Sequence, residues 1–178
     1  MAPRELVALL VVALLLFPVT ASATTTPLQG AAQTTPAEPP VAENTTLSLQ
    51  IEADGDARWT VTDTYALENA NDTRAFEELG RQYADGEIDT GWEQSFRGAS
   101  SAASEATGRR MRLTNVSREY RTTDDRGELV LSFTWTNFAT TNGSRVRLQD
   151  GFNTTRGTWL PRLYENQRLV ISPPPGYG

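Results

Sequence analysis

The chain has 178 residues, 38% of them hydrophobic and 21% charged, which is enough for one soluble domain with flanking segments. It contains no Cys and no His, so disulfides, thiolate nucleophiles, Ser-His-Asp triads and the usual zinc or haem sites are excluded. Its 16 basic and 22 acidic residues give a formal charge of -6, which argues against nucleic-acid binding by this chain.

The polar residues of the chain are also an unusual selection. All 16 basic residues are Arg, and Thr occurs 24 times. An acidic excess, Arg in place of Lys and many short hydroxylated side chains are what we expect of a protein in concentrated salt, where screening removes long-range charge repulsion. We therefore predict a halophilic source, although a genome rich in G and C would also favour Arg over Lys.

Residues 1–23 have the layout of a secretory signal peptide. Arg4 precedes an apolar run at residues 6–17, and small residues end the segment at Ala21-Ser22-Ala23. The apolar run is shorter than the about 20 residues that a membrane span needs. We expect cleavage after Ala23 and export of the mature chain, with an uncleaved anchor as the alternative.

Residues 24–45 are rich in Thr, Ala and Pro and have almost no large apolar side chain. Such a segment buries too little surface to offset its ordering entropy. We predict a disordered stalk, either O-glycosylated or undecorated. The folded domain is then expected at residues 46–172, followed by a Pro-rich exit segment at residues 173–178.

The chain contains five Asn-x-Ser/Thr sequons, none with Pro in the middle position. Together with an export signal they favour a location outside the cytosol. Each should lie at an exposed turn or strand edge, because a glycan cannot be buried. The candidate glycosylation sites are Asn44, Asn71, Asn115, Asn142 and Asn153.

The predicted domain begins with a pattern of period two. Apolar and polar side chains alternate at residues 46–53 and again at residues 58–67, which predicts two half-buried strands. Between them, Asp54-Gly55-Asp56 has the composition of a tight turn. The two strands are therefore expected to form a β-hairpin.

The period then changes to that of helices. An apolar stripe predicts a first helix that begins at Asn71 or Asp72, its N-cap, and stops at Gly86. A second stripe predicts a helix over residues 92–108, and Thr90-Gly91-Trp92-Glu93 has the pattern of a capping box.

Strand patterns return after the helices. Residues 111–120 predict a strand with a bulge near Asn115, and residues 129–136 predict the strongest strand, which should be central. Residues 139–158 are polar and predict an exposed loop with one short strand at 145–148. A last strand is predicted at residues 168–172.

The order β-β-α-α-β-β-(β)-β predicts an α+β fold. We expect a two-layer sandwich, in which an antiparallel β-sheet carries both helices on one face. The other face would carry Thr, Ser, Gln and Arg side chains and face water, which antiparallel sheets tolerate.

Three parts of the chain carry a recognisable pattern. They are residues 53–59 (ADGDARW), residues 131–138 (LSFTWTNF), and Trp159-Leu160-Pro161 with the terminal Pro-Pro-Pro-Gly-Tyr. The pattern resembles an uncharacterised haloarchaeal family of exported domains and covers residues 46–178. In that family, one transmembrane helix and a cytoplasmic winged helix-turn-helix commonly follow. The resemblance implies the outer half of a membrane-anchored transcriptional regulator whose membrane and DNA-binding parts are not in this chain.

Catalysis without His or Cys would need a pair of carboxylates, and Glu52, Asp63, Glu77 and Glu93 are the candidates. Strand and helix phase places most of them on solvated faces, which favours a surface role. Asp63 is the exception, because its phase points it into the core. There we expect a structural partner, such as an Arg.

Two acidic clusters, at residues 54–56 and 85–89, offer the oxygen ligands that calcium prefers. Neither matches an EF-hand loop, so plain turns are the favoured interpretation. No cofactor is predicted.

Two residues are candidates for contact with a ligand or partner. Trp159 lies in a loop, whereas the other three Trp residues have core-facing phases. Asn137 continues the inward phase of the strongest strand, although its amide would equally satisfy loop backbone at the strand end.

The sequence therefore predicts a non-enzymatic domain that acts outside the cytosol as a sensor or interaction module. Its partner would be an unknown extracellular ligand or an envelope protein, and membrane attachment would require a segment beyond Gly178. A free or surface-attached glycoprotein with a structural or adhesive role is the alternative. A carboxylate-based hydrolase is a third hypothesis.

Overall fold

The structure, a computed structural model, describes residues 40–143 and 145–176. The predicted signal peptide, the stalk up to residue 39 and the last two residues of the exit segment lie outside the described residues. None of the helices within these described ranges is long and apolar enough to cross a membrane.

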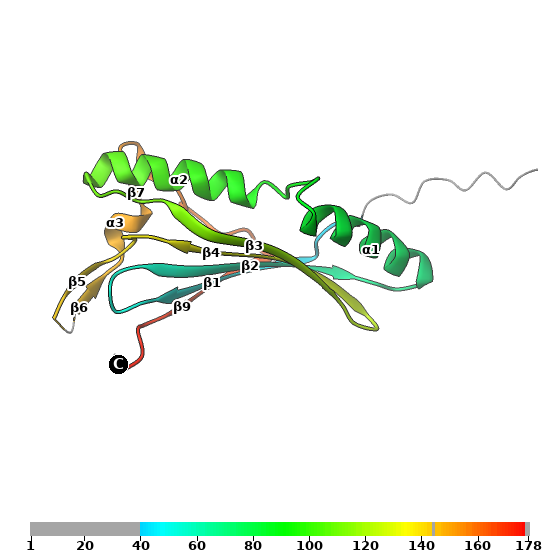
Figure 1. Ribbon diagram of the computed structural model, residues 1–178. Helices are drawn as coiled ribbons and strands as arrows, with labels where there is room; N and C mark the ends of the chain where they lie inside the picture. The colour runs from blue at the N-terminus through cyan, green and yellow to red at the C-terminus, as the bar shows by residue number, and fades with distance from the viewer. Residues whose placement is uncertain (1–39, 144, 177–178) are drawn as a thin grey trace, which may run out of the picture. The chain divides into compact units, whose positions relative to one another are not determined.

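A five-stranded sheet is the centre of the fold (Figure 1). The strand order is β3-β4-β2-β1-β9, and every neighbouring pair is antiparallel except β1 with β9. The bounds are β1 Asn44–Ile51, β2 Ala57–Ala66, β3 Leu113–Thr122, β4 Arg126–Trp135 and β9 Gln167–Ser172.

The predicted α+β sandwich is confirmed, and the sheet differs from the expected antiparallel one only at its last strand. Before β9, the chain returns to the end of the sheet where β1 begins, so that the Thr45 N–H donates to the Asn166 carbonyl at 2.9 Å. From that point β9 runs in the same direction as β1. The sheet is therefore mixed.

Two helices, α1 (Ala70–Ala84) and α2 (Trp92–Thr107), cover the same face of the sheet (Figure 1). The N-cap of α1 is Asn69, not Asn71 or Asp72 as predicted, because the Asn69 side chain accepts hydrogen bonds from both of their backbone N–H groups. The predicted capping box of α2 is wrong as well. Its N-cap is the left-handed Gly91, and the Glu93 carboxylate binds Arg97 and Arg118 instead of turning back to the helix start.

The buried side chains form two clusters between the sheet and the helices. The larger cluster packs Trp59, Phe133 and Trp135 of the sheet against Phe96 of α2. The smaller cluster lies under α1 and consists of Tyr65, Leu67, Phe76, Tyr83 and Leu129. Both clusters follow from the predicted periodicities, because their members occupy the inward phases of the strands and helices.

The bulge predicted near Asn115 is confirmed. The register between β3 and β4 shifts between Thr114 and Ser117, and Asn115 has a left-handed φ of 52°. Such a conformation suits Asn better than most residues.

The segment predicted as an exposed loop with one short strand at residues 145–148 does contain that strand, but it also contains further elements and packs against the core. It contains β5 (Thr140–Asn142), β6 (Arg145–Arg147), the short helix α3 (Gln149–Phe152), β7 (Asn153–Thr154) and β8 (Gly157–Thr158). The Phe138 and Phe152 rings lie 5.2 Å apart, and each packs against Trp59. Phe152, the aromatic residue of this polar segment, therefore attaches it to the core.

Candidate functional site

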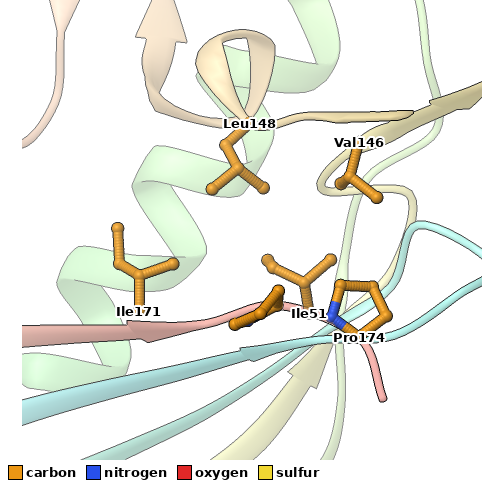
Figure 2. A pocket seen from close by; sticks show the side chains of 6 residues that line it. Ile51, Val146, Leu148, Ile171 and Pro174 are labelled. Atoms are coloured by element: carbon orange, nitrogen blue, oxygen red, sulfur yellow. The ribbon is translucent and has the colours of Figure 1, made fainter. Parts of the chain in front are cut away.

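An apolar cavity of about 260 Å³ lies where the end of β9 meets the β5–β6 hairpin (Figure 2). Figure 2 shows Val146 and Leu148 on one side of this space and Ile51, Ile171 and Pro174 on the other. We call it the β9 cavity. It is lined by Ile51, Val146, Leu148, Ile171, Pro173 and Pro174.

The local sequence explains how the cavity is built. Val146 alternates with two exposed Arg residues in β6, so the pleat of the strand turns its side chain toward the cavity. β9 ends at Ser172 because Pro173 has no N–H to extend the ladder. The Gln50 amide then donates to the Pro173 carbonyl at 2.7 Å and holds the exit segment beside β1.

None of the six residues that line the β9 cavity has a titratable side chain. Its volume lies below the range of about 300–1,000 Å³ typical of sites for whole small molecules. An engineered apolar cavity of about 150 Å³ is already large enough to hold benzene. A single aliphatic or aromatic side chain is therefore the group that fits this space best.

The strand beside the cavity is an open edge of the sheet. Among the described strands β9 pairs with β1 alone, and its Val170 and Ile171 side chains are 41% and 44% exposed. An edge strand presents backbone N–H and C=O groups that can pair with another chain. The cavity and the open edge therefore form one continuous candidate binding site.

A polar group is also buried inside the domain, the carboxylate of Asp63 in β2. Its carboxylate is only 6% exposed and accepts hydrogen bonds from the Thr45 hydroxyl at 2.7 Å and the Trp92 indole N–H at 3.1 Å. Burial raises the pKa of Asp63, while these two hydrogen bonds act in the opposite direction. Asp63 lies inward as predicted, but its partners are a hydroxyl and an indole where an Arg was expected.

Asp63 lies in β2 between Val61 of the larger hydrophobic cluster and Tyr65 of the smaller one, and charged and aromatic groups surround it. Burial raises the pKa of Tyr65 to about 12, and the negative charge of Asp63 contributes a smaller part of this shift. The Tyr65 hydroxyl therefore stays protonated. Arg118 of β3 lies over the Tyr83 ring and binds Glu93 of α2 at 2.8 Å. Burial tends to raise the pKa of Glu93, but hydrogen bonds from Arg97 and Arg118 outweigh it and hold that pKa below its usual value.

The candidate catalytic carboxylates do not converge on one space. Glu52 lies beside the β1–β2 turn and binds Arg58 at 3.3 Å, whereas Glu77 lies on α1 and Glu93 on α2. Asp63 has its own two partners inside the core. No two of these acids flank a described cavity in the way that glycoside hydrolysis requires.

The two acidic clusters considered for calcium form turns. The Asp54 carboxylate accepts from the Asp56 N–H, and the Asp56 carboxylate accepts from the Asn137 N–H at 2.8 Å. The Asp89 carboxylate accepts from the Gly91 N–H. Within residues 40–143 and 145–176, no group of three acidic side chains is arranged to hold a metal ion.

Trp159 and Asn137, predicted as contact residues, both make structural contacts. Trp159 stacks on Phe152, packs against Phe96, and donates its indole N–H to the Gly151 carbonyl at 3.0 Å. Asn137 is an exposed turn residue with a left-handed φ of 54°, and its amide donates to the Arg110 carbonyl at 2.9 Å.

The sequon asparagines differ in how accessible they are. Asn44, Asn71, Asn115 and Asn142 are exposed, whereas Asn153 is half-buried in β7. The Asn71 amide oxygen already accepts from the Arg74 guanidinium. The exposed positions satisfy the steric requirement for a glycan.

Sequence reasoning missed the β9 cavity, although a signal for part of it was present. The alternation Arg145-Val146-Arg147-Leu148 within a polar segment marks apolar side chains that need a neighbour. The other walls are distant in sequence, so nothing local indicates what Val146 and Leu148 would face.

The comparisons with known proteins agree with a domain that has no assigned chemistry. Residues 48–177 match a family described as a domain of unknown function (DUF7345). The chain belongs to this family. The match begins within β1 and continues past β9, so it contains the β9 cavity and Asp63 but not Thr45, the partner of Asp63. No curated protein and no solved structure matches the chain.

Proposed function

We propose that this DUF7345 domain is a non-enzymatic interaction module that acts outside the cytosol and recognises an apolar group of its partner at the β9 cavity. The observation that carries the proposal is the cavity itself, which has six apolar walls, no titratable lining residue and an open strand edge beside it. Such a site can supply burial and backbone pairing, which are the elements of peptide recognition.

The location outside the cytosol rests on the sequence. Residues 1–23 have the layout of a signal peptide, and the exposed sequon asparagines are compatible with glycans. The resemblance to exported haloarchaeal domains extends the proposal, and in that reading the domain is the sensor of a membrane-anchored winged helix-turn-helix regulator. The partner would then be an extracellular ligand or an envelope protein.

A structural or adhesive glycoprotein is the second candidate. It is favoured by the exposure of four sequon asparagines on different elements, because several glycans would cover much of a small domain. A carboxylate-based hydrolase has less support, since the candidate acids do not meet in a pocket.

Site-specific photo-cross-linking in intact cells tests the proposal. A photo-activatable apolar amino acid replaces Ile171 in the full chain, and the same replacement at Glu105, which is exposed in α2, is the control. We expect position 171 to give a discrete adduct with an envelope protein, and Val146→Phe, which fills the cavity, to abolish it. Recovery of the chain from the cytosol, or equal adducts from both positions, would contradict the proposal.

A further inference from the structure

The backbone of β9 has one side available for pairing. The Thr45 N–H donates to the Asn166 carbonyl, and in a parallel ladder the N–H and C=O groups of one residue point to the same neighbour. Arg168 and Val170 therefore turn their backbone groups toward β1, while Leu169 and Ile171 turn theirs away from the sheet. Among the strands that the structure describes, none pairs with this outer side.

We propose that β9 binds an extended segment of a partner protein in which apolar and acidic side chains alternate. This inference deepens the proposed function and rests on it, because it names the chemistry of the partner that the cavity receives. The segment would add a sixth strand beside β9, which is a common mode of peptide recognition. Since β9 has six residues, about six residues of the partner would pair with it.

The apolar half of the pattern follows from the helix-side face of β9. Leu169 and Ile171 are paired with Leu47 and Leu49, so their side chains lie on the face that carries the core. Ile171 also lines the β9 cavity. An added strand places every second side chain on this face, and the one nearest Ile171 would enter the cavity.

The acidic half follows from three Arg side chains along this edge, Arg168 near the start of β9 and Arg145 and Arg147 beside the cavity at its end. Arg168 alternates with Leu169 and therefore lies on the opposite face of β9. Arg145 and Arg147 flank the cavity wall Val146. Within residues 40–143 and 145–176, none of these three Arg side chains has an ion-pair partner.

The acidic groups near the cavity end are already engaged, and Glu165, which lines the same surface pocket as Arg168, forms no ion pair with it. Glu52 binds Arg58, the Asp56 carboxylate accepts from the Asn137 N–H, and Asp150 accepts from the Thr140 hydroxyl at 3.2 Å. A segment with acidic side chains on its outer face would supply the missing charge. A second copy of this chain would bring another Arg168 to the same edge, which disfavours self-association there.

Peptide binding to the full chain tests the inference. The probe is a capped hexapeptide of alternating Val and Glu, and the comparison peptide alternates Val and Lys. Titration calorimetry in low salt should give roughly tenfold tighter binding of the Glu peptide, and this preference should shrink in salt of about 1 M, where the screening length is about 3 Å.

Two pairs of variants separate the apolar and charged contributions. Val146→Phe fills the cavity and should weaken the Glu peptide by roughly tenfold, since it prevents burial of one apolar side chain. Its control is Val41→Phe, at an 83% exposed residue remote from the cavity. Arg168→Glu should reverse the preference toward the Lys peptide, and its control is Arg121→Glu on the opposite edge strand, β3.

Each outcome decides the inference. Equal binding of the two peptides, no binding of either, or equal effects of a variant and its control would overturn it. Arg168→Glu lies at an exposed position and keeps this test available even if Val146→Phe does not fold. A specific cross-link from position 171 together with failure of both peptides would leave the proposed function standing and reject only the alternating acidic segment.

Discussion

The packing of α1 on β3 depends on Gly80, and the sequence offers a matched control for testing it. An added Cβ at Gly80 would lie 2.5 Å from Cγ and 2.9 Å from Cβ of Tyr120, which is closer than real contacts allow. Gly98 is also a helical glycine, in α2, but no atom lies within 4 Å of its added Cβ. The change Gly→Ala is therefore the same in chemistry at both positions and differs only in the space available.

The expected magnitudes follow from two opposing effects. Ala in place of Gly in a helix interior stabilises the folded state by about 1 kcal/mol. Overpacking of a tight contact costs about 1–3 kcal/mol, because Tyr120 or the helix must shift. Gly98→Ala should thus raise the free energy of unfolding by about 1 kcal/mol, whereas Gly80→Ala should leave it unchanged or lower it by up to about 2 kcal/mol.

Urea denaturation followed by far-UV circular dichroism measures both values, with the midpoint shifting at constant slope. In a Tyr120→Ala background the ring is absent, so Gly80→Ala should become less destabilising. If Gly80→Ala and Gly98→Ala stabilise the protein equally, the close packing of α1 on β3 is refuted.

Three further predictions concern the interior and the surface. Since the pKa of Asp63 is raised in the folded state, its contribution to stability is present below its unfolded pKa, near 3.8, and is lost as pH rises through the folded value. The unfolding free energy of Asp63→Asn should therefore rise relative to the unmodified chain as pH increases from about 4 to 7, by about 1.4 kcal/mol for each unit of pKa shift, and an identical pH profile in urea melts would contradict this. Trp159→Ala should cost about 3 kcal/mol of unfolding free energy through lost aromatic packing, against almost none for Val41→Ala, and equal costs would place Trp159 outside the core. The acidic excess predicts that the melting temperature rises between dilute and molar salt, and a constant melting temperature would argue against it.

Local sequence patterns were sufficient for most of the elements. Period two identified the β1–β2 hairpin, and the loss of phase after Leu113 identified the bulge at Asn115. Turn chemistry was sufficient for the stop of α2 at Gly108, whose φ is 69°. The N-caps were predicted less well. Several Asn, Asp and Thr residues near each helix start are suitable caps, and the contacts of the folded chain determine which of them takes that position.

The direction of β9 and the packing of residues 139–158 against the core could not be predicted from local patterns, although the short strand β6 was predicted. Both depend on contacts between distant segments, such as the Thr45 N–H with the Asn166 carbonyl and Phe152 with Trp59. Alternation says which side chains of a strand face inward, but it does not say which neighbour the strand pairs with.

The same reason explains what could be predicted of the candidate sites. Strand phase identified Asp63 as a buried acid, yet its partner Thr45 is set by the register between β1 and β2, in which the two residues are opposite one another. The β9 cavity needs Ile51, Val146 and Ile171 together, and these residues come from three separate strands. No pattern within one strand could have indicated that space.

The two edges of the sheet differ in a way that links the fold to the proposed function. β3 carries the bulge at Asn115 and the charged residues Arg118, Glu119 and Arg121, which are features that prevent the addition of another strand. β9 pairs with β1 without a register shift and exposes Val170 and Ile171, with Arg168 as its one charged residue. A sheet with no binding role would gain solubility from protecting both edges. This difference between the two edges is what the proposed binding of a partner at β9 would use.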